Sequence, residues 1–131
     1  MRPVDQTAYG LHDGNCFNAC VASILEVPIA HVPRFSGTRW FAQFSQWLAD
    51  RQLAASFAKR GSYGPPGYSI AGGPSLRFAG RMHACVALDG IVVHDPHPSR
   101  DGLPFGIASY VVIHGPRREI DAATSARPEN S

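Results

Sequence analysis

"HDGNCFNACVASILEVP", residues 12–28, places a cysteine between a polar turn and an apolar run. The apolar run has helical spacing at Phe17, Val21, Ile24 and Leu25. Residues at i, i+4, i+7 and i+8 form one face of an α-helix, so residues 16–26 are predicted to be helical. Asn15 is a favourable N-cap, and Val27-Pro28 ends the helix because the residue before proline is disfavoured in the helical conformation. Cys16 is therefore predicted in the first turn of this helix.

The first turn of a helix is a favourable place for a nucleophilic thiol. Its backbone N–H groups lack intrahelical partners, and together with the helix dipole they favour an anion. Such a position lowers the pKa of a thiol from about 8.5, in extreme cases to about 3.5, and the thiolate is the nucleophilic form. The alternative is a small buried side chain, which is the commoner role of cysteine. Cys16 alone favours that structural role, so a prediction of catalysis depends on other residues.

The remaining chain predicts a second helix and several strands. Residues 38–52 have a helical stripe at Trp40, Phe44, Trp47 and Leu48, with Thr38 as the cap. Short strands are predicted in "LAASFAK" (53–59), in "HACVALDGIVVHD" (83–95) on both sides of a turn, and in "IASYVVIHG" (107–115). Residues 60–75 are rich in Gly, Pro and Ser and are predicted to be a long loop.

Length and composition favour one domain. The 131 residues, 44% of them apolar, suffice for a single core at residues 1–115, and the polar residues 116–131 are predicted to be a disordered tail. The N-terminus lacks an apolar signal segment, and three cysteines without framework spacing fit a reducing compartment, so a cytoplasmic protein is expected. A net charge of +2 with scattered Lys and Arg gives no indication of nucleic-acid binding. No stretch approaches the roughly 20 apolar residues of a membrane span.

"HACVALDGIVVHD" supplies a second and third candidate for chemistry. His83 opens one strand and Asp95 ends the next, and a Cys–His pair with a carboxylate orienting the imidazole is the general form of an activated nucleophile. A two-residue turn at Asp89-Gly90 would pair His83 with Pro96 and place Asp95 on the opposite face. A three-residue turn at Leu88-Asp89-Gly90 would pair His83 with Asp95. The catalytic interpretation therefore predicts the three-residue turn.

The order of a Cys at a helix start, a His opening a strand and an Asp on the adjoining strand resembles the papain-like cysteine peptidase superfamily. The similarity is closest to its small bacteriocin-processing-type branch in bacteria and phages. It covers roughly residues 4–104 and rests on the sequences "VDQT", "GNCFNACVASILEVP", "GGPS", "HACVALDG" and "VVHDPHPS". The resemblance implies a papain-like α+β fold in which the helix headed by Cys16 packs on a small antiparallel sheet.

The resemblance also implies the roles of individual residues. Cys16 would be the nucleophile, His83 the general base and Asp95 the carboxylate that orients it. Gln6 is the expected oxyanion donor, although it precedes Cys16 by ten residues where the family has about six, and Asn15 or the Cys16 backbone N–H could serve instead. The expected reaction is hydrolysis of a peptide or isopeptide bond in a protein or peptide substrate, with no cofactor.

Substrate contacts are expected from the glycine-rich segment and the strand end, at Tyr68, Gly73, Ser75 and His97.

Three alternatives remain open. "DGNC" also resembles ovarian-tumour-type deubiquitinases, whose histidine lies late in the chain, where this sequence has His114. A non-catalytic, phage-encoded binding module on the same fold would depend on exposed aromatic residues instead of Cys16. A structural zinc site would need four ligands, and Cys16, Cys20, His83 and Cys85 could supply them; no metal is expected, because the usual CxxC pair is missing.

Overall fold

The computed structural model describes residues 1–10, 14–59 and 64–115. It contains helices α1 (Cys16–Leu25) and α2 (Trp40–Ala49) and a short 3-10 helix, η1 (Ile29–His31). Five strands follow: β1 (Ala54–Lys59), β2 (Tyr68–Pro74), β3 (Met82–Leu88), β4 (Ile91–His94) and β5 (Ser109–His114). The tail predicted at residues 116–131 lies outside the described residues.

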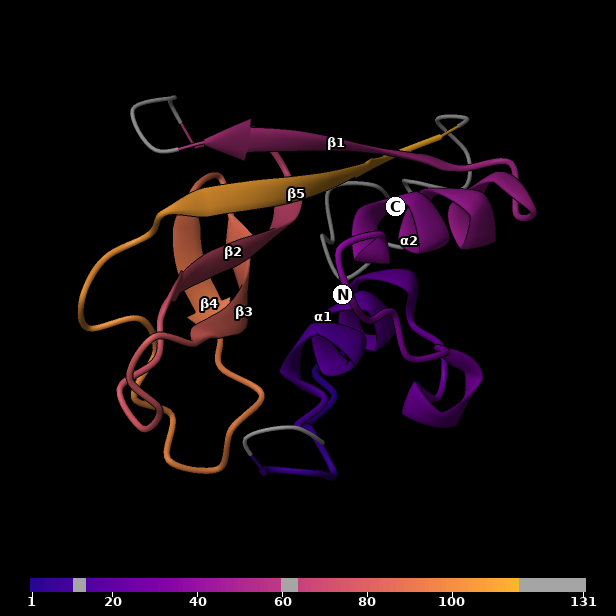
Figure 1. Cartoon of the computed structure of the whole chain (residues 1–131). Coiled ribbons are helices and arrows are strands. Elements are labelled where there is room, and N and C mark those ends of the chain that lie inside the picture. Colours follow the sequence, from indigo (N-terminus) through magenta and orange to yellow (C-terminus); the bar gives the residue numbers. More distant parts are fainter. Residues whose placement is uncertain (11–13, 60–63, 116–131) are drawn as a thin grey trace.

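The strands form one antiparallel sheet in the order β1-β5-β2-β3-β4. In Figure 1 both helices lie to one side of this strongly twisted sheet, and β1 extends across α2. Helix α1 packs on β3 and β2, and α2 packs on β1. The expectation of an α+β fold with an N-terminal helix packed on an antiparallel sheet is therefore confirmed.

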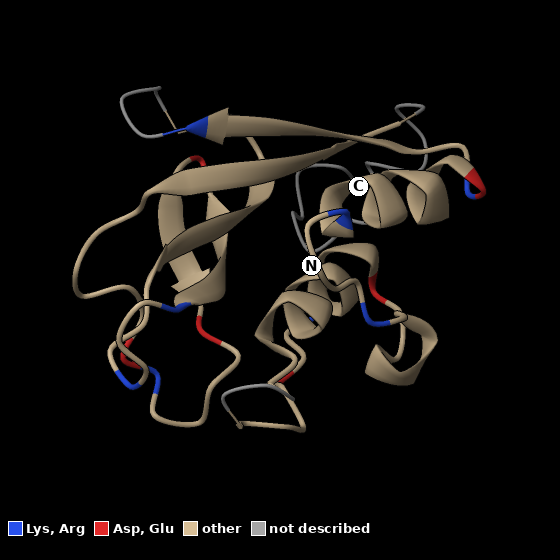
Figure 2. Ribbon diagram, viewed as in Figure 1, with Lys and Arg blue, Asp and Glu red and all other residues tan. Residues whose placement is uncertain are grey.

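The core lies between the helices and the sheet. Its fully buried side chains include Val21 of α1, Phe44 and Leu48 of α2, and Ile70 and Val86 of the sheet. Burying a side chain of this size contributes about 1.5–3 kcal/mol, so the apolar stripes hold α1 and α2 on the sheet. Lys, Arg, Asp and Glu lie in the loops and near the ends of the elements (Figure 2).

Both predicted helices exist with slightly shorter bounds. Glu26 ends α1 in a left-handed conformation, with a φ of 57°, where the prediction continued to residue 26. Helix α2 begins at Trp40 after Arg39, so Thr38 is not its N-cap. Among the described residues no helix is both long and apolar enough to cross a membrane.

The prediction of a loop over residues 60–75 is wrong in its second half. Tyr68–Pro74 form β2, which pairs with β3 on one side and β5 on the other, and the prediction for residues 60–63 lies outside the described residues. A side chain at Gly73 could not fit, because a Cβ there would lie 2.2 Å from the carbonyl oxygen of Gly106. The glycines that suggested a loop thus permit a close approach to the backbone of the 103–106 segment.

Candidate functional site

His83 and Asp95 form a buried hydrogen-bonded pair. His83 Nε2 lies 2.7 Å from Asp95 Oδ1, and the residues are 6% and 5% exposed. Asp95 also accepts hydrogen bonds from the backbone N–H groups of His97 (2.9 Å, at Oδ1) and Gly102 (2.8 Å, at Oδ2). Burial alone would raise the pKa of the Asp95 carboxyl, but the bonds from His83 and the two N–H groups hold it well below its ordinary value. Asp95 is therefore a carboxylate that fixes the imidazole.

The hairpin brings these residues together by a different route from the one predicted. Leu88 pairs with Ile91, so the turn has two residues, and positive φ values of 52° at Asp89 and 84° at Gly90 correspond to type I′. The predicted three-residue turn is wrong. A bulge between the Ala87–Val92 and Val86–His94 pairs adds one residue to β4 and shifts every later residue to the other face.

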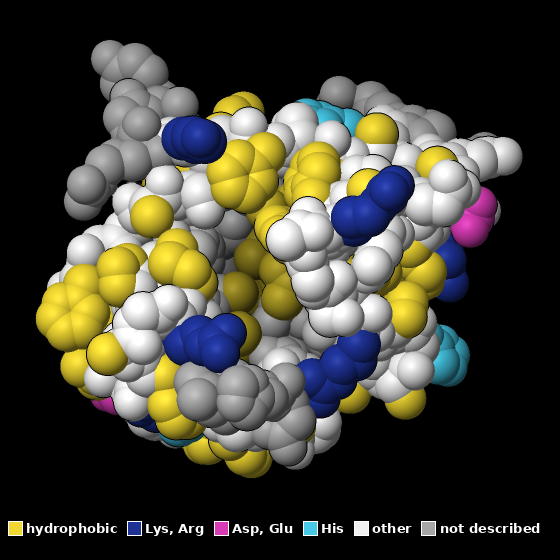
Figure 3. Space-filling model, in the orientation of Figure 1, with side chains coloured by type: hydrophobic (Ala, Val, Ile, Leu, Met, Phe, Trp, Pro, Cys, Tyr) yellow, Lys and Arg dark blue, Asp and Glu magenta, His cyan; other side chains and the backbone are white. Residues whose placement is uncertain are grey.

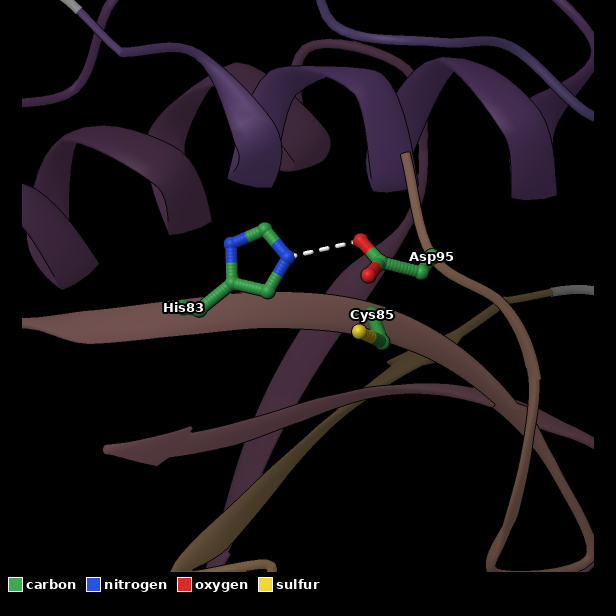
Figure 4. Close-up of side chains that lie close together, drawn as sticks. All are labelled: His83, Cys85 and Asp95. Atoms are coloured by element: carbon green, nitrogen blue, oxygen red, sulfur yellow. Dashed lines mark hydrogen bonds and ion pairs between the residues drawn. The ribbon is translucent and has the colours of Figure 1, made fainter. Parts of the chain in front are cut away.

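Asp95 directly follows the Val86–His94 pair, so the shifted register turns it toward the face of β3 that carries His83 and Cys85. His83 and Cys85 are two residues apart on β3 and share a face. Figure 4 shows the ring of His83 directed toward Asp95, and the ligand atoms of His83, Cys85 and Asp95 lie within 4.8 Å of one another. The bulge thus achieves what the catalytic interpretation required of the turn.

Cys16 begins α1 beside the half of β3 that β4 leaves unpaired. Strand β4 pairs only with Val86–Leu88, so the first residues of β3 have a free edge on that side. The Cys16 side chain is half-buried, and burial by itself would raise its pKa. A hydrogen bond and the charge of His83 lower the pKa of the thiol, as do the backbone N–H groups of Ala84 and Phe17, and the net effect is a lowered pKa.

His83 is held in its protonated form by the same contacts. Burial opposes its charge, but hydrogen bonds to Asp95, Cys16 and Cys85 outweigh it and raise the pKa of His83 to about 11. Nε2 is bonded to Asp95, so Nδ1 is the ring nitrogen that remains to interact with Cys16. A lowered thiol pKa beside a raised imidazole pKa shifts the equilibrium of this pair toward thiolate and imidazolium.

The other two cysteines are buried. Cys20 and Cys85 are 0% exposed, and burial raises the pKa of both thiols. Among the described residues, His83, Cys85 and Asp95 are the group whose ligand atoms could meet at one metal ion; Cys16 and Cys20 do not belong to it. The four-ligand zinc set considered for the sequence is therefore not assembled. The 2.7 Å bond between His83 and Asp95 uses the atoms that would bind a metal.

Asn15 connects the segment that carries Gln6 to the helix start. Its Oδ1 accepts bonds from the backbone N–H groups of Thr7 and Ala8, both at 3.0 Å, and its Nδ2 donates to Thr7 Oγ1. The side chain makes no capping hydrogen bond to α1, so the expected N-cap bond is absent. With its amide engaged in this way, Asn15 is a positioning residue for residues 6–8.

Gln6, the oxyanion donor that the resemblance implies, lines a cleft with Cys16. The residue is 5% exposed, and it lines the same cleft as Cys16 and His83. Its backbone N–H donates to Pro96 O at 3.1 Å, directly after Asp95, and its Nε2 donates to Ala8 O at 2.9 Å. Among the described residues, this is the one hydrogen bond that Gln6 Nε2 donates.

Cys16 and His83 lie where two clefts meet. The first, of about 630 Å³, is mainly apolar and is lined among others by Phe17, Phe35, Trp40, Phe57 and Met82. The second, of about 430 Å³, is lined among others by Gln6, Tyr9, Ser75, Arg77, Arg81 and His97. Figure 3 shows the hollow in this face, with hydrophobic side chains on its floor and Lys or Arg side chains at its rim.

Of the four residues predicted to bind substrate, two line a cleft and two do not. Ser75 and His97 line the second cleft. Gly73 pairs with His83 across β2 and β3 and supports the site from behind, since neither cleft includes it. Tyr68 does not reach either cleft: it lies at the opposite end of β2 and packs on the core. His114, the late histidine of the deubiquitinase alternative, pairs with Ser56 at 2.7 Å and lines neither cleft.

Sequence reasoning missed Arg77, Arg81 and Arg100. Arg100 makes a bidentate ion pair with Asp5, at 2.6 and 2.8 Å, and its guanidinium also bonds to the carbonyl oxygen of Asp95. The arginines had no signal in the sequence, because scattered basic residues look like ordinary surface charge.

Comparisons with models of protein families, with curated proteins and with solved structures found no match to this chain.

Proposed function

We propose that this protein is a cysteine-dependent amide hydrolase, a peptidase or isopeptidase of papain-like type. The observation that carries the proposal is the arrangement of Cys16, His83 and Asp95, which unites a helix-start thiol of lowered pKa with an imidazole anchored by a buried carboxylate. A nucleophile, a base and an orienting group in this order are the general requirements of covalent catalysis.

Each residue would have its own role in the hydrolysis. The Cys16 thiolate attacks the carbonyl carbon of the amide, and His83 gives its Nδ1 proton to the leaving amine as the C–N bond breaks. A water molecule then attacks the thioester and His83 takes one of its protons. The C–S bond breaks, which releases the acid and restores the Cys16 thiolate beside protonated His83. The backbone N–H of Cys16 and the side-chain amide of Gln6 are the candidates for stabilising the oxyanion.

Two further observations fit a substrate with extended contacts. Cys16 and His83 stand at the junction of two clefts, so groups on both sides of the scissile amide have room. The first cleft is lined by aromatic rings, among them Phe17 and Trp40, which pack edge to face with centroids 5.4 Å apart. It suits an apolar side chain of a protein or peptide substrate.

The proposal is tested by hydrolysis of a peptide library, read by mass spectrometry. The wild-type protein should cleave a definable set of peptides, and Cys16→Ala and His83→Ala should each lower kcat/KM at least about 10³-fold. Cys20→Ala is the matched control, because it removes the same thiol one helical turn away and should retain activity. Equal activity of Cys16→Ala and wild type would refute the proposal.

A further inference from the structure

The second cleft is lined by cations as well as by aromatic rings. Arg77 and Arg81 line it together with His97, and Cys16 and His83 lie at its inner end. None of the described residues that line this cleft is an Asp or a Glu. Positive charge without a lining carboxylate is the composition expected of a site for an anion.

Both arginines are presented by one ordered loop between β2 and β3. Ser75 Oγ accepts the backbone N–H groups of Arg77 and Phe78, both at 3.1 Å. The loop is closed by the backbone bond from Ser75 N to Arg81 O at 2.8 Å. The hairpin therefore sets the starting points of the two guanidinium groups before any ligand binds.

The guanidinium groups have little competition from other groups of the described chain. Arg77 makes a long contact with Ser99 Oγ at 3.4 Å and a loose ion pair with Asp101 at 3.8 Å. Within the described residues, Arg81 has no hydrogen-bond or ion-pair partner for its guanidinium group. An exposed pair at 3.8 Å contributes little, so a ligand can replace it at small cost.

His97 adds a neutral donor. Its Nδ1 accepts the backbone N–H of Ser99 at 3.0 Å, so the proton of the neutral ring is on Nε2. Burial and the charge of Arg77 both lower the pKa of His97, which keeps the ring neutral at pH 7. The ring is also held edge to face against Tyr9, with centroids 5.5 Å apart.

We propose that the second cleft is a carboxylate subsite, formed by Arg77, Arg81 and His97, and that the substrate carries a free carboxylate on this side of the scissile amide. Planar guanidinium groups bind carboxylates through paired N–H···O bonds, which gives both affinity and orientation. This inference rests on the proposed function of Cys16 only in assigning the carboxylate to an amide substrate. The carboxylate can belong to a chain end or to an Asp or Glu side chain.

Alkylation of Cys16 tests the subsite without any substrate. Iodoacetate and iodoacetamide react alike: the sulfur attacks the CH2 carbon, an S–C bond forms, and iodide leaves. They differ in charge, so the ratio of their rate constants removes any change in thiol pKa. In wild type, iodoacetate should react with saturation, and Arg77→Gln with Arg81→Gln should lower the iodoacetate-to-iodoacetamide ratio about tenfold. Added salt should lower the wild-type ratio as well.

Arg39→Gln is the matched control, because this arginine is exposed and lines neither cleft. It removes one unit of charge and should leave the ratio unchanged. An equal ratio in wild type and the double variant would overturn the subsite, even if the protein proves to be a peptidase.

Binding to Cys16→Ala by calorimetry covers the case in which the thiol does not react, and it separates the two sources of the carboxylate. N-acetylglutamine offers only a terminal carboxylate, and N-acetylglutamic acid α-amide offers only the side-chain carboxylate. The preferred compound should bind at least tenfold more weakly when Arg77 and Arg81 are replaced. If both compounds bind equally well to Cys16→Ala and to Cys16→Ala in which Arg77 and Arg81 are also replaced, the subsite is refuted. Retained binding by Cys16→Ala without peptide hydrolysis by wild type would refute only the proposed function.

Discussion

Asp95 accepts three hydrogen bonds through two oxygens, from the imidazole of His83 and from the backbone N–H groups of His97 and Gly102. All three donors need an acceptor, and an ionised carboxylate is the side chain that offers only acceptors. The negative charge in turn stabilises protonated His83, which lowers the pKa of Cys16. One residue thus fixes the orientation of His83 and, through it, lowers the pKa of Cys16.

Asp95→Asn should raise the pKa of Cys16. An asparagine keeps one acceptor oxygen but turns an NH2 group toward one of the three donors and removes the charge that favours imidazolium. The rate of Cys16 alkylation by iodoacetamide is followed by mass spectrometry across pH 5 to 10. Its rise with pH should therefore occur at higher pH in Asp95→Asn than in wild type. Asp50→Asn, at the end of α2, changes the net charge equally and should not shift the curve. Superimposable curves for wild type and Asp95→Asn would show that Asp95 is not coupled to the thiol.

At the scale of elements, the β3–β4 hairpin decides where Asp95 lies. The Asp89-Gly90 turn has the type I′ conformation, in which both central residues have positive φ. Asp89 is also tied to the segment before β2, since its Oδ1 accepts the N–H of Gly67 at 2.7 Å. Gly90 packs directly on the backbone of Gly64, where an added Cβ would lie 2.6 Å from the Gly64 Cα.

Gly90→Ala should destabilise the fold more than an equivalent change elsewhere. Gly80 has a φ of 77° and open space around its missing Cβ, so Gly80→Ala measures the cost of the left-handed backbone alone, about 1–2 kcal/mol. Gly90→Ala, with a φ of 84°, adds the overlap with Gly64 and should cost about 1–3 kcal/mol more. Urea denaturation of both variants makes the comparison. Equal losses would mean that the hairpin and residue 64 do not pack as described.

At the scale of the whole molecule, the N-terminal segment connects α1 to the end of β4, the edge strand beside β3. His94 Nε2 donates to the carbonyl oxygen of Val4 at 3.0 Å, and the backbone N–H of Val4 donates to Ser23 Oγ in α1 at 2.9 Å. The Asp5–Arg100 ion pair and the bond from Gln6 N to Pro96 O continue this connection. Cys16 and His83 therefore come from two parts of the fold that residues 4–8 connect.

The ionised site should make stability depend on pH in the alkaline range. The pKa of His83 is raised to about 11, against about 6.5 in an unfolded chain, so its stabilising contribution is lost as pH rises toward the folded value. The lowered pKa of Cys16 partly offsets this loss below about pH 8.5, because there the unfolded chain binds the thiol proton more tightly than the folded chain does. The free energy of unfolding of wild type should therefore fall relative to His83→Gln between about pH 9 and 11, by up to about 1.4 kcal/mol per pH unit. Urea denaturation at each pH measures it, and parallel curves would contradict the raised pKa.

Local patterns in the sequence were enough to predict the α+β class, both helices and most strands. Helical spacing in residues 16–26 depends only on neighbours along the chain, and so does the placement of Cys16 in a first turn. The candidates Cys16, His83 and Asp95 could also be chosen from the sequence, because cysteine, histidine and aspartate are recognised individually by their chemistry.

Tertiary structure decided how those residues meet. A bulge in β4, not a longer turn, puts Asp95 beside His83, and nothing in "IVVHDP" fixes where an extra residue is accommodated. Strand β2 forms in a Gly-Pro-rich segment because β3 and β5 pair with it from both sides, which outweighs weak local preference. Asn15 orders residues 7–8 instead of capping α1, and Arg77 and Arg81 face the cleft because Ser75 shapes their loop. These outcomes depend on contacts between segments that are distant in the sequence, and local sequence patterns do not predict such contacts.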